Sequence, residues 1–420
     1  MRQPEQPIEN DLECNEVAIS EPPQPPDGGF GWVMVAACST INCFTWGVTS
    51  SYGIYLSEYL LSNTFDRASP MDYGFVGGFN FAFAMVIAPL TTYLVPRLGK
   101  HAVMLAGSVL QCVGYIGASF AGKIVHLYIT QGALVGCGIG LMIVPSMAIL
   151  SQWFSRKRSV ANGLSSAGSG IGGIVFSWGT RSMIKSMGLA WALRATGLIT
   201  LAANCIAILL IRDRNDHIKP TQLAFDLVLL RQYKVILLLL WAFISMFGYI
   251  ALLFSLSDFA LAIGLSREEA TDIVGFLNLG TAVGRPIIGI MSDHFSRVNT
   301  AAVLTFSCGI ICFALWMPAK TYGLTVFFSL LCGAILGVFW MTISPLCVEV
   351  AGLKNLPSLL SLSWATIILP TTFAEAIALQ IRRPDAHMPY LYPQIFAGLS
   401  YMLASAFMFE LRRVLRKMPI

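Results

Sequence analysis

Two charged side chains stand inside long apolar stretches of this sequence. Arg285 follows Gly284 in a mostly apolar run, and Glu375 lies in the stretch PTTFAEAIAL. An arginine in apolar surroundings is costly and calls for an anionic partner, which its planar fork can bind bidentately. A carboxylic acid in such surroundings can take up and release a proton. The sequence therefore predicts a site for a small anion and a site for a proton.

Both charged residues have a second interpretation. Arg285 would be structural if it formed an ion pair near the cytoplasmic end of its helix, for example with Asp293. Glu375 would be an ordinary solvated carboxylate if it lay at the outer end of its helix, because sequence alone does not fix how deep a residue sits. Both alternatives stay open at this stage.

Helical spacing adds five candidates to the anion site: Asn278, Thr281, Asn42, Trp46 and Ser50. Asn278 and Thr281 precede Arg285 by seven and four residues, which places them on its helix face. The other three are four residues apart and give their helix an unusually polar face. We expect these faces to line a cavity; interhelical hydrogen bonding is the alternative. Trp340 and Trp364 are interpreted as packing or interface residues.

The elements that must position these residues are membrane-spanning helices. The chain has 420 residues, 56% hydrophobic and 12% charged, whereas soluble domains carry about 25% charged residues. Twelve continuous apolar runs are long enough to cross a bilayer, which takes about 20 residues, and their continuity excludes a β-barrel. The predicted spans are 32–60, 71–95, 101–121, 124–150, 160–180, 190–211, 234–259, 269–292, 298–317, 321–346, 356–380 and 391–411.

The polar segments predict orientation and domain organisation. Most Lys and Arg residues fall on the side of the membrane that carries the termini, so we expect both termini in the cytoplasm. The longest internal polar loop, 212–233, is predicted to be a cytoplasmic linker between six-helix halves at 27–211 and 234–411. Residues 1–26 read as a disordered cytoplasmic tail, and 412–420 as a short cytoplasmic tail.

Other function classes find little support in the sequence. The net charge is +5, but the basic residues lie between apolar runs rather than in one patch, so no nucleic-acid partner is expected. The histidines and cysteines lack metal-ligand spacing, and no nucleophile elbow or phosphate-binding loop occurs. We therefore predict no metal, no cofactor and no catalytic residue, and a protein that is not an enzyme.

Three motifs resemble those of one transporter family. The first is Asp27-Gly28-Gly29-Phe30-Gly31-Trp32, at the start of the first span. The second, WFSRKRSVANGLSSAG at 153–168, holds Arg156, Arg158 and Gly163. The third is Gly284-Arg285-Pro286, followed by Gly289 and the pair Ser292-Asp293. Together they resemble the monocarboxylate porter family of the major facilitator superfamily, most closely its fungal branch, over residues 27–411.

The resemblance implies twelve helices in two pseudo-symmetric halves, with the substrate between them. In characterised animal members, a lysine in the first span and an aspartate–arginine pair in the eighth serve proton-coupled carboxylate transport. The arginine corresponds to Arg285 in this chain. The lysine position holds Ser50, and the aspartate position holds Thr281.

The motif residues have structural interpretations. Asp27 is expected to cap the first span, or else to pair with an arginine of another loop. We expect the motif glycines Gly28, Gly29, Gly31 and Gly163 to permit a tight turn or close helix packing. Trp32 suits the membrane interface. The cluster from Arg156 to Arg158 is expected to anchor anionic lipid, with a gating salt bridge as the alternative.

These features predict a secondary active or facilitative transporter of a small organic solute, most simply a monocarboxylate or a related metabolite. It would work by alternating access in a lipid bilayer, and proton coupling is a further expectation. The alternatives are an exporter of a small secondary metabolite and a non-transporting nutrient sensor. We expect the plasma membrane as its location, with the vacuole or another organelle as the alternative.

Overall fold

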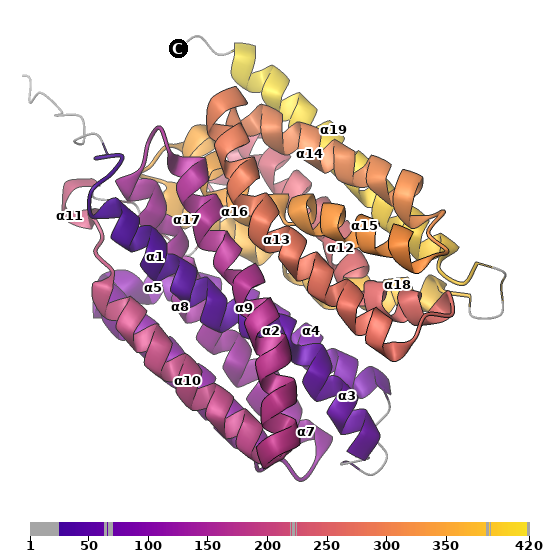
Figure 1. Cartoon of the computed structure of the whole chain (residues 1–420). Coiled ribbons are helices and arrows are strands. Elements are labelled where there is room, and N and C mark those ends of the chain that lie inside the picture. The colour runs from indigo at the N-terminus through magenta and orange to yellow at the C-terminus, as the bar shows by residue number, and fades with distance from the viewer. Residues whose placement is uncertain are drawn as a thin grey trace, which may run out of the picture.

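The computed structural model describes residues 25–62, 65, 70–218, 220, 223, 225–383, 386 and 388–417. The predicted tail at 1–26 lies outside these residues up to residue 24, and so do the last three residues of the chain. In the described part, all regular structure is helical, and the helices form one elongated bundle (Figure 1).

The helices up to residue 210 are called the N-terminal group here, and Figure 1 draws them in indigo to magenta. Two π-helical segments interrupt them. The elements are α1 (Gly31–Asn42), η1 (Cys43–Gly47), α2 (Val48–Ser50), α3 (Tyr52–Ser62), α4 (Pro70–Val86), α5 (Ala88–Leu98), α6 (Lys100–Ala118), α7 (Ile124–Leu127), η2 (Tyr128–Leu134), α8 (Val135–Trp153), α9 (Arg158–Met187) and α10 (Leu189–Leu210).

The connection to the second set of helices holds the short helix α11 (Asn215–Ile218) and the 3-10 turn η3 (Leu229–Arg231). The helices that follow are called the C-terminal group. They are α12 (Tyr233–Ala262), α13 (Arg267–Phe295), α14 (Arg297–Ile311), η4 (Cys312–Trp316), α15 (Tyr322–Leu336), α16 (Val338–Ala351), α17 (Leu356–Thr366), α18 (Ile368–Ile381) and α19 (Leu391–Lys417).

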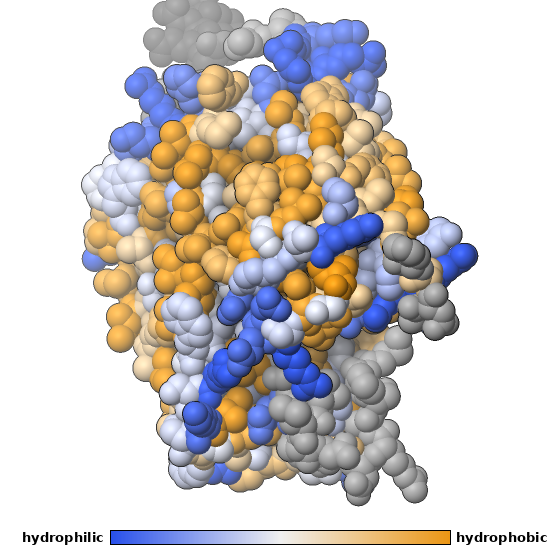
Figure 2. All heavy atoms as spheres, turned by 45° about the vertical axis from the view of Figure 1, so that its right-hand side comes forward, coloured by the Kyte–Doolittle hydropathy of each residue, from blue (hydrophilic) through white to orange (hydrophobic). Residues whose placement is uncertain are grey.

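Helices occupy all twelve predicted spans in the described part of the chain. Ten stretches are long and apolar enough to cross a membrane, and α4 with α5, bent by 46°, makes an eleventh. The twelfth is α9, whose 30 residues exceed the roughly 20 needed but are rich in Gly and Ser. On the face that Figure 2 shows, hydrophobic residues cover much of the surface, and hydrophilic residues gather at the upper end and again in the lower half. The all-helical membrane fold predicted from the sequence is thereby confirmed.

The small residues of α9 let two neighbouring helices approach its backbone. A Cβ atom at Gly170 would lie 2.6 Å from the backbone nitrogen of Ala282 on α13. A Cβ atom at Gly172 would overlap the backbone of Cys43 in η1. Helix α9 is therefore packed backbone to backbone against the N-terminal group on one side and the C-terminal group on the other.

We expect Gly170→Val to destabilise the fold, because the added methyl groups must push α13 away from α9. Overpacking of this kind costs about 1–3 kcal/mol. The midpoint of thermal unfolding of the purified protein in detergent measures the effect. Gly179→Val, on the same helix with open space around its Cβ position, is the control and should unfold like the parent. Equal midpoints for both variants would contradict close packing at Gly170.

Candidate functional site

Arg285 lies on α13 at the contact with α9. Its side chain is buried, with only 6% of the residue exposed. Its Nη1 donates to the carbonyl oxygen of Ser166 at 2.8 Å and to the hydroxyl of Ser169 at 2.7 Å. Both acceptors belong to α9, so the guanidinium bridges the two groups of helices.

The rest of the guanidinium has few partners. Its Nε is buried and has no hydrogen-bond acceptor among the described residues. A Cβ atom at Gly337, between α15 and α16, would lie 2.7 Å from Nη2, so only a glycine leaves room for the fork there. Arg285 forms no ion pair within the described part of the chain, and Asp293 pairs with Arg297 at 3.3 Å instead. The alternative of an Arg285–Asp293 pair is wrong.

The predicted neighbours of Arg285 on α13 face two different helices. Asn278 points toward α9, because a Cβ atom at Gly173 would lie 2.8 Å from its Oδ1. Thr281 is turned toward α15, where its hydroxyl bonds the carbonyl oxygen of Gly333 at 3.1 Å. The structure thus brings Asn278 and Arg285 to the same helix pair, whereas the hydroxyl of Thr281 is used in packing.

The polar face predicted for the first span is broken by a π-helical segment. Residues Cys43–Gly47 form η1, whose wider turn changes the direction of the side chains that follow. Asn42 donates to the hydroxyl of Ser165 on α9 at 3.2 Å. Trp46 instead stacks on Phe81 of α4, and Ser50 lies beside Gly173 of α9. Asn42 and Ser50 thus both meet α9, whereas Trp46 faces α4 and α16. The expectation that all three share one face is wrong, because it assumed a regular α-helix.

An aromatic cluster lies next to Arg285 and joins the two groups of helices. Trp46 stacks on Phe81 with ring centroids 4.9 Å apart, and it meets Trp340 of α16 at 5.7 Å. Trp340 also contacts Tyr249 of α12 at 5.9 Å and Trp364 of α17 at 5.5 Å. Tyr249 is close enough to Arg285 to interact with its charge. We call these five aromatic residues the central aromatic cluster.

The central aromatic cluster is not predicted by the sequence pattern. Trp340 and Trp364 are almost fully buried between helices, which agrees with the prediction that they are packing residues. Tyr249 was not singled out. Its signal would have been a phenol hydroxyl in the middle of the apolar run at 234–259, which needs a polar partner when buried.

Glu375 lies on α18 and faces α12. Both of its carboxylate oxygens accept a bond from the hydroxyl of Ser255 at 3.3 Å. Nearby, Asp258 of α12 pairs with Arg382 at 2.5 Å and accepts a bond from the phenol of Tyr390. Burial and this bond to Asp258 raise the pKa of Tyr390, so the phenol stays protonated as the donor. Among the described residues Glu375 has no ion pair, and Ser255 is its hydrogen-bond donor.

Asp27 binds a loop instead of capping the first helix. Its Oδ1 accepts the backbone N–H groups of Ser155 at 2.7 Å and Arg156 at 2.9 Å. The N-cap of α1 is Phe30, which makes no side-chain capping bond. Both sequence interpretations of Asp27, the cap and the ion pair with an arginine, are therefore wrong. The cause is a backbone with φ of 53° that aims the carboxylate at the α8–α9 loop.

A second aspartate holds the same loop from the C-terminal group. The carboxylate of Asp293 on α13 accepts the backbone N–H groups of Ser159 at 2.9 Å and Val160 at 2.8 Å. These N–H groups belong to the first turn of α9, where a negative charge is favoured. Arg297 donates to the carbonyl oxygen of Ser155 at 2.5 Å. We call this arrangement of Asp293, Arg297 and the first turn of α9 the inter-group latch.

The remaining motif residues lie around this loop. Arg156 is exposed, whereas Arg158 is buried and donates to the carbonyl oxygen of Phe154 at 3.0 Å. Trp32 packs against Phe154 with ring centroids 5.1 Å apart. A Cβ atom at Gly31 would lie 2.9 Å from the Phe154 ring. The glycine thus permits α1 to contact the loop directly.

Three further motif glycines have different surroundings. A Cβ atom at Gly163 would lie 2.6 Å from the carbonyl oxygen of Arg285, so this glycine permits close helix contact beside the site. Gly28 and Gly29 are surrounded by open space. Gly29 has a φ of 57°, which a glycine adopts without strain.

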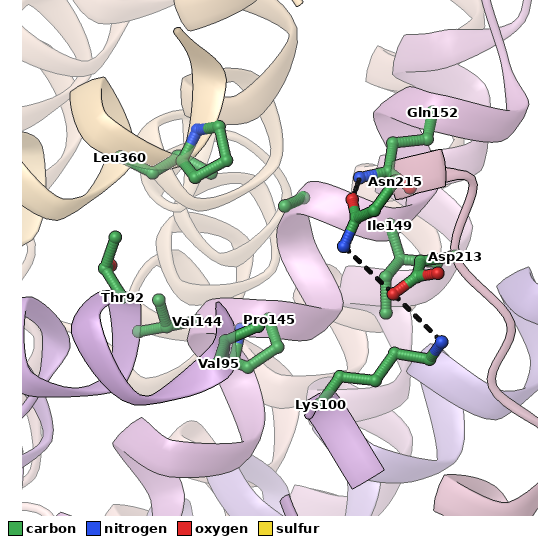
Figure 3. Close-up of a pocket in the computed structure, with 12 residues that line it drawn as sticks. Thr92, Val95, Lys100, Val144, Pro145, Ile149, Gln152, Asp213, Asn215 and Leu360 are labelled. Carbon is green, nitrogen blue, oxygen red and sulfur yellow. Dashed lines mark hydrogen bonds and ion pairs between the residues drawn. The ribbon is translucent and has the colours of Figure 1, made fainter. Parts of the chain in front are cut away.

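Figure 3 shows a cavity away from Arg285, between α5, α6, α8 and α17. Its volume is about 40 Å³, close to the share of one water molecule. Its polar side chains bind each other: Lys100 pairs with Asp213 at 2.9 Å, and Gln152 donates to Asn215 at 2.8 Å. We therefore place the candidate site at Arg285 and the central aromatic cluster, where buried donors lack acceptors.

Comparison with known proteins identifies the family. A model described as "Major Facilitator Superfamily" matches residues 35–369. The chain is 34% identical over 394 residues to the "Probable transporter MCH2" of Saccharomyces cerevisiae, covering 92% of this chain and 83% of the relative. It is 33% identical over 397 residues to the "Uncharacterized transporter ESBP6" of the same yeast, covering 90% of this chain and 58% of that relative.

The solved structures agree on the fold. The structure of the proton:xylose symporter XylE matches with a TM-score of 0.71 at 15% identity, covering 91% of this chain and 95% of that chain. At 15% sequence identity, this match shows a shared fold and nothing about function. The family model covers most of the chain, and the two yeast relatives are named as transporters, so these matches show the family as well as the fold. The chain belongs to the major facilitator superfamily and is a multi-pass membrane transporter.

Proposed function

We propose that this transporter is a monocarboxylate porter that carries a small organic anion. Arg285 is the observation that supports this most strongly. It is a buried cation with no carboxylate partner in the described part of the chain, and its Nε has no acceptor. A buried charge without a counter-ion is strongly unfavourable. An anionic solute would supply both the missing charge and the missing acceptor, and a carboxylate fits the arginine fork bidentately.

The position of Arg285 suits alternating access. The side chain belongs to α13 but binds two oxygens of α9. We take residues 27–211 and 234–411 as two halves that rock about this contact, with the solute between them. A carboxylate at Arg285 would strengthen the contact between the halves at the moment when the solute must be enclosed. Binding would then favour the closed arrangement through contacts that the empty protein lacks.

Glu375 is our candidate for proton coupling. It is the carboxylate that lies on the inner side of α18 with a serine hydroxyl as its hydrogen-bond donor. The neutral form of such a group avoids the cost of a buried charge, so a proton on Glu375 would accompany the passage of the solute anion. Asp258 is a weaker candidate because Arg382 already balances its charge.

The inter-group latch is our candidate for the cytoplasmic gate. We place both termini in the cytoplasm, at the end of the bundle where Asp27 and Asp293 hold the α8–α9 loop. Ser151 of α8 and Ser344 of α16 add a hydroxyl–hydroxyl contact of 2.8 Å nearby. We infer that these contacts close the cytoplasmic side in the described state. We place the protein in the plasma membrane, with uptake as its direction.

Arg285→Lys should weaken the binding of carboxylates. The lysine keeps the charge but loses the bidentate fork, and one charge-assisted bond is worth about 1.5–3 kcal/mol, or roughly 10- to 150-fold in affinity. The measurement is the KM for uptake of a radiolabelled monocarboxylate into proteoliposomes, across a panel of acids. Arg267→Lys, at the exposed start of α13, is the control. An unchanged KM in Arg285→Lys would contradict the proposal that Arg285 binds the carboxylate of the solute.

Glu375→Gln should uncouple transport from the proton gradient. The amide cannot give up or take a proton, yet it keeps the size of the side chain and its bond to Ser255. We expect counterflow at equal pH to persist while stimulation by an imposed pH gradient disappears. Glu268→Gln, an exposed carboxylate on α13, should respond to the gradient like the parent. Gradient-driven accumulation by Glu375→Gln would exclude this residue as the proton site.

Asp293→Asn should loosen the cytoplasmic gate. Removing a capping carboxylate from a helix start costs about 0.5–2 kcal/mol, which shifts the open population several-fold. A cysteine introduced at Ser344 reports opening through its rate of labelling by an impermeant maleimide, measured against the protein without that cysteine. Asp272→Asn, exposed on the same helix, is the control. Equal labelling rates in both variants would mean that Asp293 does not hold the gate.

A further inference from the structure

Two buried indole N–H groups of the central aromatic cluster have no acceptor. Trp340 is 7% exposed and Trp364 is 1% exposed, and the Nε1 of each lacks a hydrogen-bond partner among the described residues. Buried donors are satisfied in the great majority of cases, so each exception needs a physical explanation. The Nε1 of Trp340 is near the hydroxyl of Tyr249 but makes no bond of normal geometry with it.

A neighbouring tryptophan shows what a purely structural indole does in this fold. Trp241 of α12 is fully buried, and its Nε1 donates to the hydroxyl of Thr305 at 3.0 Å. Trp316 also lacks an acceptor, but it packs between Phe259 and Phe328 inside the C-terminal group. Trp340 differs from both, because it contacts Trp46 of the N-terminal group.

The indole N–H groups without acceptors and the Arg285 guanidinium lie in the same region of the bundle. The Arg285 guanidinium lies against Gly337, and the backbone N–H of Trp340 bonds the carbonyl oxygen of that glycine at 3.1 Å. The ring of Tyr249 contacts Trp340, and Tyr249 also interacts electrostatically with Arg285. Three N–H groups without acceptors, from Arg285, Trp340 and Trp364, are therefore linked through one layer of aromatic rings.

We propose that Trp340 and Trp364 form a second part of the solute site, and that the solute is a carboxylate attached to a flat ring that carries acceptor atoms. The carboxylate would bind Arg285, so this inference rests on the proposed function. The ring would enter between the aromatic faces, where flat groups stack favourably. Its heteroatoms would accept the indole N–H groups, which gain the partners they now lack.

The ring contacts between the two groups of helices explain how such a solute could enter. Trp46 and Phe81 come from the N-terminal group; Trp46 contacts Trp340 in the described state, and Phe81 stacks on Trp46. Phe81 also meets Phe254 of α12 at 5.9 Å. When the halves rock apart, these contacts separate and expose the two indoles. The cluster thus acts as both the lid and the lining of the site.

Three radiolabelled acids separate the chemical features in uptake by the full chain in proteoliposomes. Nicotinate has a ring and an acceptor nitrogen, benzoate has the ring alone, and butyrate has neither. We expect the parent protein to have its lowest KM for nicotinate. Trp340→Phe and Trp364→Phe keep a ring but remove the N–H, so they should raise the KM for nicotinate about fivefold and change that for benzoate less than twofold. Trp316→Phe is the control and should change neither.

Equilibrium binding to the solubilised protein distinguishes the ways in which this inference can fail. If the parent handles butyrate as well as nicotinate, the ring site is wrong while the anion proposal stands. If both Trp→Phe variants weaken all three acids equally, the indoles are structural and the inference is overturned. If no acid binds to the parent and Arg285→Gln changes nothing, the proposed function itself is wrong.

Discussion

The contact between α9 and α13 is the constraint on which the rest of the structure depends. Glycines on α9 bring the two backbones together, and Arg285 reaches across to two α9 oxygens. Among the described residues, no carboxylate pairs with this guanidinium. The helix therefore holds a buried cation whose charge the described chain does not balance, and such a charge is tolerated only where it serves a purpose.

The same pair of helices carries different chemistry along its length. At one end, Asp293 of α13 binds the first turn of α9 through charge and backbone N–H groups. Farther along, Asn278 meets α9 at Gly173, where Ser50 of the first span also lies. Between these polar contacts, glycines such as Gly163 and Gly170 bring the two backbones into close approach. A pair of helices joined in this way can separate at one end while the other stays closed.

Much of the fold was predictable from the sequence, whereas the site was only partly so. Long apolar runs fix the helices because a bilayer offers no other partner for the backbone, and Arg285 stands out because its charge is costly there. The prediction of one face for Asn42, Trp46 and Ser50 was wrong because it assumed a regular α-helix, whereas η1 inserts a wider turn between the first and the last of them. The predicted capping role of Asp27 was wrong because its φ of 53° and its hydrogen bond to the α8–α9 loop depend on the tertiary structure.

Trp340 and Trp364 are buried among other rings, as the packing prediction expects. A tryptophan in an apolar run looks like packing in either case, and only the three-dimensional neighbourhood reveals whether its N–H finds an acceptor. Trp241 finds Thr305, whereas Trp340 and Trp364 find none. Unsatisfied donors and an unbalanced cation both weaken the empty closed state. A solute that satisfies all of them would stabilise that state most when the two halves meet, which ties solute binding to closure by the same contacts that give specificity.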